Sequence, residues 1–372
     1  MTVEHLLAPS EHARAEPATR PVVNSWDEFT TLREVVVGDA TGAAIPDLTA
    51  DPSAWLNYYP ELTASELAAV RTGRYPQWII DETNEDLAGL VGLLEQFGVT
   101  VRRPVPIDHS ARFGTPDWHT TGFSTYCPRD LTLVVGSTLI ETPSPARSRY
   151  FEQFGLRPLL QDYLAQGAQW LAAPRPRLTD ELFALDEQGL PVLGETEPAF
   201  EAANVLRLGR DLLYQVSRSG NELGLRWLES TMRLVGDVRV HPLRDVYGYT
   251  HIDSTIAFLR PGLVLLNPER ITPDTVPAPL AGWDVVWCPP IDEGPLAMDH
   301  ALSGRWISMN LLMLDEQHAV VDADQPALLA TLERRGITVV PHRLRHQRVL
   351  GGGFHCVTLD VVRDGGPENY LG

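Results

Sequence analysis

Apolar residues recur at helical spacing in the stretch that runs from residue 84 to residue 104. The positions that fall on one helical face are Leu87, Leu90, Val91, Leu94 and Phe97. Asn84 stands where a cap is expected at the start of this helix, and Gly98 stands where a helix ends. A short strand and Pro104 follow, so the stretch predicts a helix, a turn and a strand.

The same order of helix, glycine, short strand and proline returns four more times along the chain. It is present in "LLQDYLAQGAQWLAAP", "LRWLESTMRLVGDVRVHP", "PLAGWDVVWCPP" and "PALLATLERRGITVVP". The glycines that end the five helices are Gly98, Gly167, Gly236, Gly282 and Gly336. A residue without a Cβ suits these places because helices often end in the left-handed conformation.

Strand candidates lie between these helices, which places the chain in the α/β class. They are "REVVVGD", "LTLVVGSTLIE", "LLYQVS", "LVLLNPE" and "HAVVD". We therefore expect five units, each combining strands with one helix. The alternative is an ordinary α/β protein, in which helix, glycine and strand also alternate, and the pattern does not decide between a ring of units and an open sheet.

The charge of the chain argues against nucleic acid and against anionic membranes as partners. The sequence carries 49 acidic and 30 basic residues, a formal charge of −19. Such a field repels a phosphate backbone, although acidity alone does not identify a cationic substrate. The 44% of hydrophobic residues is enough for a large core.

The ends of the chain and its cysteines bear on compartment and redox state. Residues 1–21 lack a basic leader and a long apolar stretch, and we expect them to form a flexible N-terminal arm ahead of a single domain over residues 22–372. We expect the protein to be cytoplasmic. Three cysteines without close metal-type spacing indicate neither a disulfide framework nor a zinc site.

One of these cysteines, Cys356, stands in an unusual setting in "LGGGFHCVTLDVV". Three glycines leave the backbone bare just before it, so that a ligand can approach the thiol. A thiol attacks only as the thiolate, which requires a nearby cation or base. His355 is adjacent, but neighbouring strand residues point to opposite faces, so we expect the base to come from elsewhere. A buried core thiol is the competing interpretation.

The candidate base lies in "YTHIDSTIAFLR", where His251 and Asp253 are two residues apart at the start of a strand-like run. At that spacing both side chains face one cavity. The pair has two other interpretations: two ligands of a metal site, or a hydrogen-bonded strand end.

Four further charged residues stand where strands or helices are expected to begin or end: Asp130, Arg149, Glu201 and Arg270. By default such residues are solvated surface groups.

Taken in order, these stretches resemble the arginine-dependent amidinotransferases over nearly the whole chain, from Asn24 to about Leu371. The motifs that carry the resemblance are "TGRYPQWIIDET", "CPRD", "ARSRYFE", "EPAFEAANVLR", "THIDST", "NPER", "RWISMNLLMLDE" and "LGGGFHCVTLDVVR". They look closer to the bacterial aminocyclitol-phosphate type than to the animal glycine type.

The resemblance implies a five-fold pseudosymmetric α/β propeller of ββαβ units, the pentein fan, with the active site at its centre. It places the nucleophile on Cys356, the general acid and base on His251, and the carboxylate that orients this histidine on Glu201. The family members compared have aspartate in "FDAA" where this chain has "FEAA". Glutamate keeps the charge but is one methylene longer.

The same matching assigns substrate contacts. Asp130 and Asp253 fall on the carboxylates that hold the donor guanidinium, whose planar N–H groups suit two acids. Arg149 and Arg270 fall on basic residues of the substrate pocket, with Arg270 our choice for the α-carboxylate of arginine. Ser303 matches a pocket serine. It is followed by Gly304 in "LSGRW", where glycine-specific enzymes resemble "SSKW".

The function that the resemblance implies is a two-step amidino transfer through an amidino-cysteine. L-Arginine is the donor, ornithine leaves, and a small amine accepts the group, with an aminocyclitol phosphate expected first and glycine second. The resemblance implies no metal or organic cofactor and a homodimer as the assembly to test. The alternatives are an arginine deiminase-like hydrolase on the same fold and a non-catalytic propeller that binds proteins.

Overall fold

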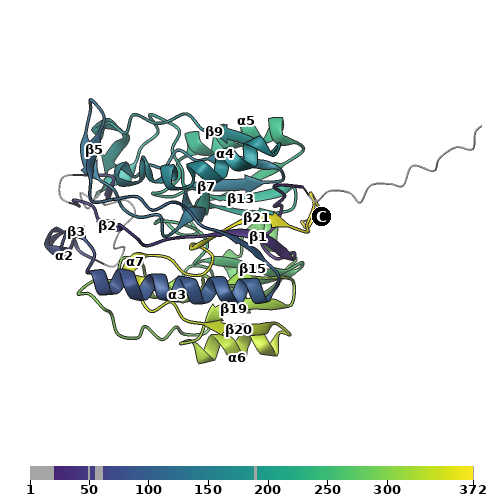
Figure 1. The fold of residues 1–372 in the computed structure, drawn as a ribbon. Helices are drawn as coiled ribbons and strands as arrows, with labels where there is room; N and C mark the ends of the chain where they lie inside the picture. Colours follow the sequence, from purple (N-terminus) through teal and green to yellow (C-terminus); the bar gives the residue numbers. More distant parts are fainter. Residues whose placement is uncertain (1–20, 49–50, 55–61, 188–190, 372) are drawn as a thin grey trace, which may run out of the picture.

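Five three-stranded sheets carry the fold. The computed structural model describes residues 21–48, 51–54, 62–187 and 191–371, and within these it contains the five sheets and three two-stranded ones (Figure 1). In each three-stranded sheet the middle strand pairs antiparallel with one neighbour and parallel with the other. A parallel pair needs a crossover connection, which gives four of these units the chain order strand, strand, crossover, strand, whereas the first unit takes one strand from the C-terminal end.

The five units follow one another along the chain, except that the first unit takes one of its strands, β21, from the C-terminal end. The first unit contains β1 (Leu32–Val37), α3 (Gln77–Gln96), β4 (Thr100–Arg102) and β21 (Thr358–Arg363). The second contains β7 (Thr132–Val135), β8 (Thr138–Glu141), α4 (Arg157–Ala165) and β9 (Gln169–Ala172). The third contains β12 (Val205–Leu208), β13 (Asp211–Gln215), α5 (Glu222–Val235) and β14 (Arg239–Leu243).

In the last two units the crossover segment between the two parallel strands is shorter than in the first three. The fourth contains β15 (Ile256–Arg260), β16 (Leu263–Leu266) and β17 (Asp284–Trp287). The fifth contains β18 (Leu312–Met313), β19 (His318–Asp322), α6 (Pro326–Arg334) and β20 (Thr338–His342). The remaining elements are α2 (Ala64–Ala69), α7 (Gln347–Leu350), β2 (Ala44–Ile45), β3 (Gly73–Arg74), β5 (Arg112–Gly114), β6 (His119–Thr121), β10 (Phe183–Leu185) and β11 (Pro191–Leu193).

The first sheet joins the two ends of the fold. The order of its strands is β21, β1, β4, so the C-terminal strand pairs antiparallel with the first long strand. Apolar clusters then connect each unit to the next. One cluster joins β1 and β21 to β7 and β8, and a second joins β7 and β8 to β12 and β13. A third runs from β12 through β15 and β16 to β18 and β19. A fourth joins β18 and β19 to β1.

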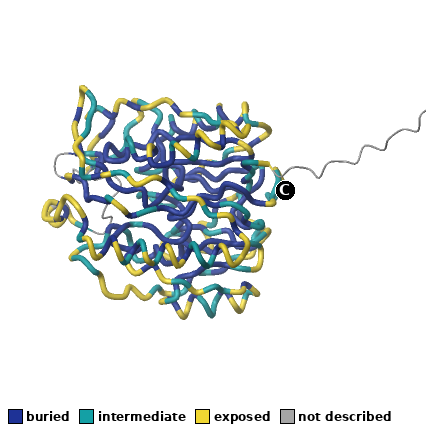
Figure 2. Tube along the Cα trace, in the orientation of Figure 1, coloured by how far each residue is buried: buried dark blue, intermediate teal, exposed yellow. Residues whose placement is uncertain are grey.

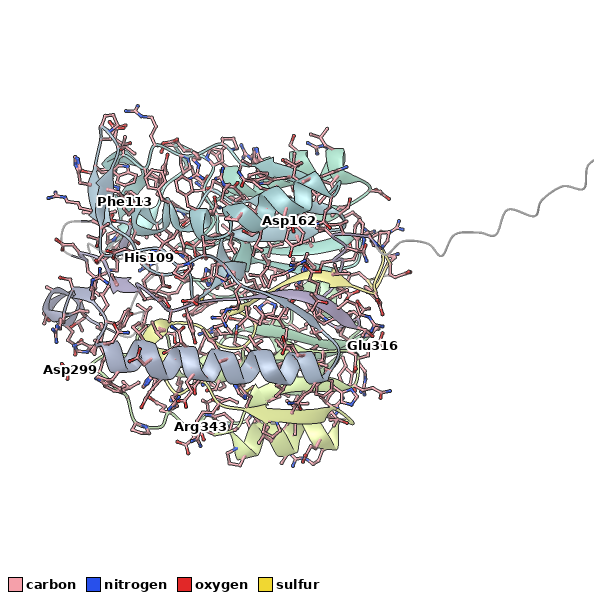
Figure 3. All side chains as sticks on the ribbon, viewed as in Figure 1. His109, Phe113, Asp162, Asp299, Glu316 and Arg343 are labelled. Atoms are coloured by element: carbon pink, nitrogen blue, oxygen red, sulfur yellow. The ribbon has the colours of Figure 1, made fainter. Side chains whose placement is uncertain are left out.

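The helices lie outside the strands that they connect. In Figure 1, α4 and α5 lie at the top of the view and α6 at the bottom, with strands between them. Figure 2 shows the strands mostly buried and the outer turns of the helices exposed. Charged side chains such as Asp162, Glu316 and Arg343 are exposed at this periphery (Figure 3). None of the described helices is long and apolar enough to cross a membrane.

Two sequence expectations about helices are wrong in detail. The first predicted helix begins at Gln77, after Pro76, and not at Asn84. Asn84 lies inside α3, and its side chain bonds the loop of the first unit, accepting from Ala40 N at 3.0 Å and donating to Thr41 Oγ1 at 3.0 Å. Its polarity therefore serves a tertiary contact and not a cap.

The fourth predicted helix is the other error. Before Gly282 the chain forms two short 3₁₀ turns, Pro273–Thr275 and Ala278–Leu280, where an α-helix was expected. Three prolines in "TPDTVPAPLAG" remove backbone donors that an α-helix needs. The predicted arm over residues 1–21 lies outside the described residues except for Pro21, and the single domain over 22–372 stays a prediction.

Candidate active site

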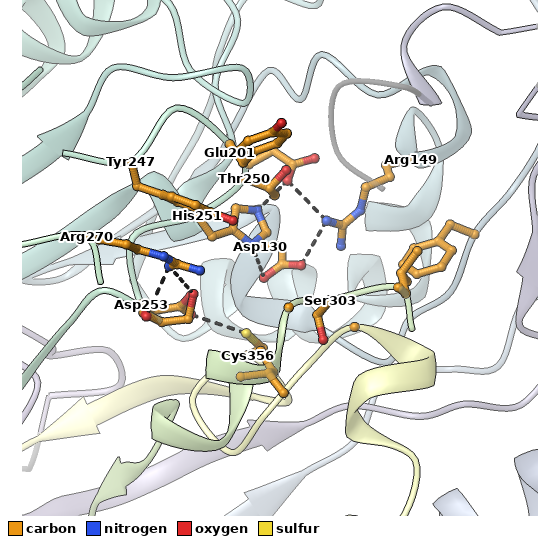
Figure 4. A pocket seen from close by; sticks show the side chains of 17 residues that line it. Asp130, Arg149, Glu201, Tyr247, Thr250, His251, Asp253, Arg270, Ser303 and Cys356 are labelled. Atoms are coloured by element: carbon orange, nitrogen blue, oxygen red, sulfur yellow. Dashed lines mark hydrogen bonds and ion pairs between the residues drawn. The ribbon is translucent and has the colours of Figure 1, made fainter. Parts of the chain in front are cut away.

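His251 stands in the loop between β14 and β15, where the chain takes an uncommon conformation. Its φ is +61°, in the left-handed region that residues with a Cβ rarely adopt. Such strain persists where surrounding contacts hold it, often at functional sites. The expected strand start is thus wrong, because His251 and Asp253 both precede β15 in a loop. The two side chains nevertheless line one cavity (Figure 4).

The ring of His251 is held by carboxylates. Its Nε2 lies 2.5 Å from Oε2 of Glu201, and its Nδ1 lies 3.8 Å from Oδ1 of Asp130. Burial would lower the pKa of His251, but the charge of Asp130 and the hydrogen bond to Glu201 outweigh it and raise the pKa to about 9. The imidazole is therefore cationic near neutral pH and is equipped to give a proton.

Glu201 lies directly before the 3₁₀ turn Ala202–Asn204 and is fully buried. Its Oε1 accepts from the hydroxyl of Ser144 at 2.6 Å, and its Oε2 accepts from Arg149 at 3.2 Å. Burial would raise the pKa of Glu201, but Arg149 and the bond to His251 lower it to about 2. The longer side chain of glutamate thus reaches the histidine that it was expected to orient.

Arg149 is the buried hub of three carboxylates. Its guanidinium donates twice to Glu152, at 2.9 and 2.8 Å, and once each to Asp130 at 2.8 Å and Glu201 at 3.2 Å. A planar fork with five donors can serve several acids at once, which an ammonium cannot do in the same geometry. Arg149 lines the pocket as expected, but its contacts hold the acids in place.

Cys356 lies in a turn just before β21, between the glycines and the strand. Its Sγ lies 3.3 Å from Oδ2 of Asp253, to which the thiol donates. The neighbouring thiol of Cys127, burial and the charge of Asp253 raise the pKa of Cys356 well above its usual value. In the substrate-free site the sulfur is therefore a neutral thiol.

The glycines in front of this thiol are required by close packing. A Cβ on Gly352 would lie 2.4 Å from the Sγ of Cys127 and 3.2 Å from the Cβ of Cys356. Gly351, with φ +78°, ends α7 in the left-handed conformation. The bare backbone foreseen from the sequence thus serves to pack the two thiols together.

Asp253, Arg270 and Ser303 complete the wall of the cavity. Burial would raise the pKa of Asp253, but the hydrogen bond and charge of His355 lower it to about 2. Arg270 donates from Nη1 to the hydroxyls of Ser254 and Thr255, at 2.9 and 2.7 Å, and its guanidinium lies 3.5 Å from the ring centroid of Tyr247.

The eight site residues expected from the sequence all line one cavity (Figure 4). They are Asp130, Arg149, Glu201, His251, Asp253, Arg270, Ser303 and Cys356. The surface alternative is wrong for three of the four charged residues, since Asp130, Arg149 and Glu201 are buried. Two buried oxygens of the wall, Oδ1 of Asp130 and Oγ of Ser303, accept or donate no hydrogen bond within the described part of the chain. Such atoms are normally satisfied by a ligand or water.

Sequence reasoning missed the residues that support this wall. Asn310 accepts from the backbone N–H of Cys356 at 3.0 Å and donates to the backbone carbonyl of Asp253 at 3.2 Å. It therefore ties the nucleophile segment to the guanidinium-binding segment. Asn310 is the last residue of the motif "RWISMN", but nothing in the sequence pattern assigns it a role.

The metal alternative paired His251 with Asp253. The described residues whose ligand atoms gather closely enough to hold an ion are instead Asp130, Glu201 and His251, within 4.8 Å of one another. Arg149 already supplies a cation to both carboxylates, at 2.8 and 3.2 Å. The cluster therefore suits a charged imidazole better than a divalent ion.

Comparison with known proteins agrees with this geometry. The chain is 49% identical over 344 residues to inosamine-phosphate amidinotransferase 1 of Streptomyces griseus. The alignment covers 92% of this chain and 96% of that protein. It is 35% identical to the mitochondrial glycine amidinotransferase of Gallus gallus, over 99% of this chain and 89% of that protein. The chain belongs to the arginine-dependent amidinotransferase family. No protein-family model matches it.

Solved structures place the same family on this fold. The inosamine-phosphate amidinotransferase StrB1 of Streptomyces griseus matches with a TM-score of 0.89 and 47% identity over 95% of this chain and 100% of that one. DDAH of Pseudomonas aeruginosa is 14% identical with a TM-score of 0.57 over 88% of this chain and 99% of that one, which shows the fold alone. The pentein fold and the amidinotransferase reaction class expected from the sequence are both confirmed. The family uses arginine as donor and an amine as acceptor.

Proposed function

We propose that this amidinotransferase moves the amidino group of L-arginine to an aminocyclitol phosphate in natural-product biosynthesis, through a covalent amidino group on Cys356. The observation that carries the proposal is the shared cavity wall, in which one thiol stands beside two carboxylates and a cationic histidine. The acceptor class follows from relatives named inosamine-phosphate amidinotransferases, which are 45 to 49% identical to this chain.

The donor guanidinium lies between Asp130 and Asp253 in this proposal. The Oδ1 of Asp130 makes no hydrogen bond in the described structure, and Oδ2 of Asp253 already lies 3.3 Å from the sulfur. Two acids on either side fix the plane of a guanidinium and turn its central carbon toward the thiol. Arg270 receives the α-carboxylate, and the Oγ of Ser303 receives a polar atom of the substrate.

The charge of the substrate prepares the nucleophile. The neighbouring thiol of Cys127, burial and the charges of two anions, Asp253 and Asp130, raise the pKa of Cys356 and keep the proton on its thiol before a substrate binds. A guanidinium bound between those anions neutralises them and brings a positive charge to the sulfur, which lowers the cost of forming the thiolate.

The first step forms a carbon–sulfur bond and breaks a carbon–nitrogen bond. The sulfur of Cys356 attacks the guanidinium carbon while His251 gives its proton to the departing Nε, which becomes the δ-amine of ornithine. Ornithine leaves with a neutral amine. The proton that the thiol loses passes to His251 and makes its imidazole cationic again. Positioned proton transfer of this kind contributes about 10²- to 10⁴-fold to the rate.

The second step reverses the roles. The acceptor amine attacks the amidino carbon and the carbon–sulfur bond breaks, while His251 gives its proton to the departing sulfur and takes up the proton that the amine loses. The product is the guanidino form of the acceptor. Each step uses only the two substrates and groups of this chain, provided that water is kept from the amidino carbon of the covalent intermediate.

Incubation with arginine alone tests the covalent step. The peptide that contains Cys356 should gain one amidino group by mass, with ornithine released in equal amount. Ornithine release without that mass gain would remove the covalent step. Citrulline or ammonia as the main product would favour the hydrolase alternative.

Competition between acceptors tests the substrate class. We expect kcat/KM for an inosamine phosphate to exceed that for glycine. The relatives named inosamine-phosphate amidinotransferases are more similar to this chain than those named glycine amidinotransferases. A higher value for glycine would move the proposal to its second choice. The cytoplasmic location and the homodimer stay predictions, the latter to be measured by light scattering on the purified chain.

A further inference from the structure

A second histidine, His355, lies behind the active site and bridges two buried carboxylates. Its Nδ1 lies 2.9 Å from Oδ2 of Asp253, and its Nε2 lies 3.1 Å from Oε2 of Glu28. His355 and Glu28 do not line the active-site cavity. They line a separate, small cavity, and Asp253 lines both. The imidazole therefore reaches Asp253 from the side opposite to the substrate.

The imidazole of His355 is the donor in its hydrogen bonds to Asp253 and Glu28. Burial raises the pKa of Glu28, but Arg207 and the bond to His355 hold it well below its usual value, and the pKa of Asp253 is about 2. An ionised carboxylate only accepts hydrogen bonds, so the ring nitrogen is the donor in each contact that is made. A hydrogen-bond donor thus lies behind the carboxylate that faces the guanidinium.

Glu28 gives this bridge a rigid base. The guanidinium of Arg207, on β12, donates from Nε to Oε1 of Glu28 at 3.0 Å and from Nη2 to Oε2 at 2.7 Å. Arg129 donates from Nε to the backbone carbonyl of His355 at 2.7 Å. Both the ring and the backbone of His355 are therefore fixed by buried, charged side chains.

The oxygen that His355 holds is also the one that the nucleophile contacts. Oδ2 of Asp253 accepts from Nδ1 of His355 at 2.9 Å and from the thiol of Cys356 at 3.3 Å. The orientation of this carboxylate decides where a guanidinium lies relative to the sulfur. A displacement of the reacting carbon by about 1 Å can cost roughly 10²-fold in rate.

We propose that His355 is a positioning residue for amidino transfer, which through its Nδ1–H fixes the carboxylate of Asp253 beside Cys356. The inference rests on the proposed function, because it needs a guanidinium on Asp253. It gives the histidine of "GGGFHC" a role through Asp253, although its ring does not enter the substrate cavity.

Two near-isosteric variants separate the two ends of the ring. The amide nitrogen of asparagine reaches the place of Nδ1, and that of glutamine reaches the place of Nε2. His355→Asn therefore keeps a donor to Asp253 and loses the contact to Glu28, whereas His355→Gln does the reverse. Each variant removes one bond and places a neutral amide where the imidazole was.

The measurement is kcat/KM for arginine by ornithine release, with circular dichroism and thermal unfolding as checks of folding. We expect His355→Gln to lower kcat/KM about 10- to 100-fold, the loss that one hydrogen bond to a charged group produces, and His355→Asn to restore most of it. Where His355→Gln does not fold, His355→Ala takes its place in the same comparison.

Equal losses in the two folded variants, or full activity in His355→Gln, would overturn the positioning role. This failure differs from a failure of the proposed function. In the former case the wild-type chain still forms amidino-Cys356 and releases ornithine, whereas in the latter it does neither.

Discussion

The Nε2 atom of His251 lies 2.5 Å from Oε2 of the fully buried Glu201. This contact and the charge of Asp130 raise the pKa of the histidine to about 9. The raised pKa keeps the ring protonated below pH 9 and removes its acid function above that pH. We therefore expect kcat/KM for arginine to fall on the alkaline side near pH 9.

Glu201→Gln tests this relationship. Removal of the negative charge lowers the pKa of His251, so the alkaline fall of kcat/KM should move about one unit or more toward neutral pH. Glu201→Asp keeps the charge and should leave the fall near its original pH, although the shorter side chain lowers the rate. An unchanged pH profile in Glu201→Gln would show that a group other than His251 causes the alkaline fall of kcat/KM.

Asp130→Asn should weaken binding of a charged substrate and not of a neutral one of the same shape. The Oδ1 of Asp130 is buried without a hydrogen-bond partner in the described structure, which leaves it available to a guanidinium. We expect arginine to bind about 10- to 100-fold more weakly, as for the loss of a charge-assisted bond. Calorimetry on the Cys356→Ala background, which cannot turn over, measures the effect.

Citrulline is the matched ligand for that measurement, since it carries a neutral urea in place of the guanidinium. Its affinity should change little in Asp130→Asn. An equal loss for both ligands would point to a collapsed pocket and against a charge contact.

Cys356→Ala should abolish ornithine release, by roughly 10⁴-fold or more, because no other group replaces the sulfur as nucleophile. Cys288→Ala is the control. Cys288 is buried in the apolar cluster around β15 and β16, and burial raises its pKa to about 12. This control variant should keep its activity at a small cost in stability. Retained ornithine release in Cys356→Ala would refute the role of the thiol.

Gly352→Ala should lower both stability and activity. The added Cβ would lie 2.4 Å from the Sγ of Cys127, and overpacking of this kind costs about 1 to 3 kcal/mol. Cys127→Ala removes the atom that is struck, so the double variant should recover part of the loss in chemical denaturation. Additive losses in the double variant would contradict this account.

The repeating units were predictable because each one leaves a local signature. A helical stripe followed by a glycine and a β-rich run marks four of the five crossovers, and α3, α4, α5 and α6 follow it. The fourth unit escaped because prolines before Gly282 replace the α-helix by 3₁₀ turns. Asn84 was misread as a cap because its partners, at residues 40 and 41, are distant in sequence.

The site was predictable in its members but not in its connections. The motifs named eight residues, and these meet in one cavity. Strand alternation was the wrong reason for placing His251 and Asp253 together, since a left-handed turn does so. The hydrogen bonds of Arg149 to Asp130 and Glu201 and of Asn310 to two segments join residues that are far apart in sequence, so no local pattern reveals them.

The pairing of β21 with β1 has a consequence for the newly made chain. Cys356 lies two residues before β21, so the pairing of the last strand with the first fixes the segment that carries the sulfur. During synthesis on the ribosome, the segments that carry the other groups of the cavity emerge before this one. A chain cut before residue 356 lacks the nucleophile, so we expect amidino transfer to require both this C-terminal segment and its pairing with β1.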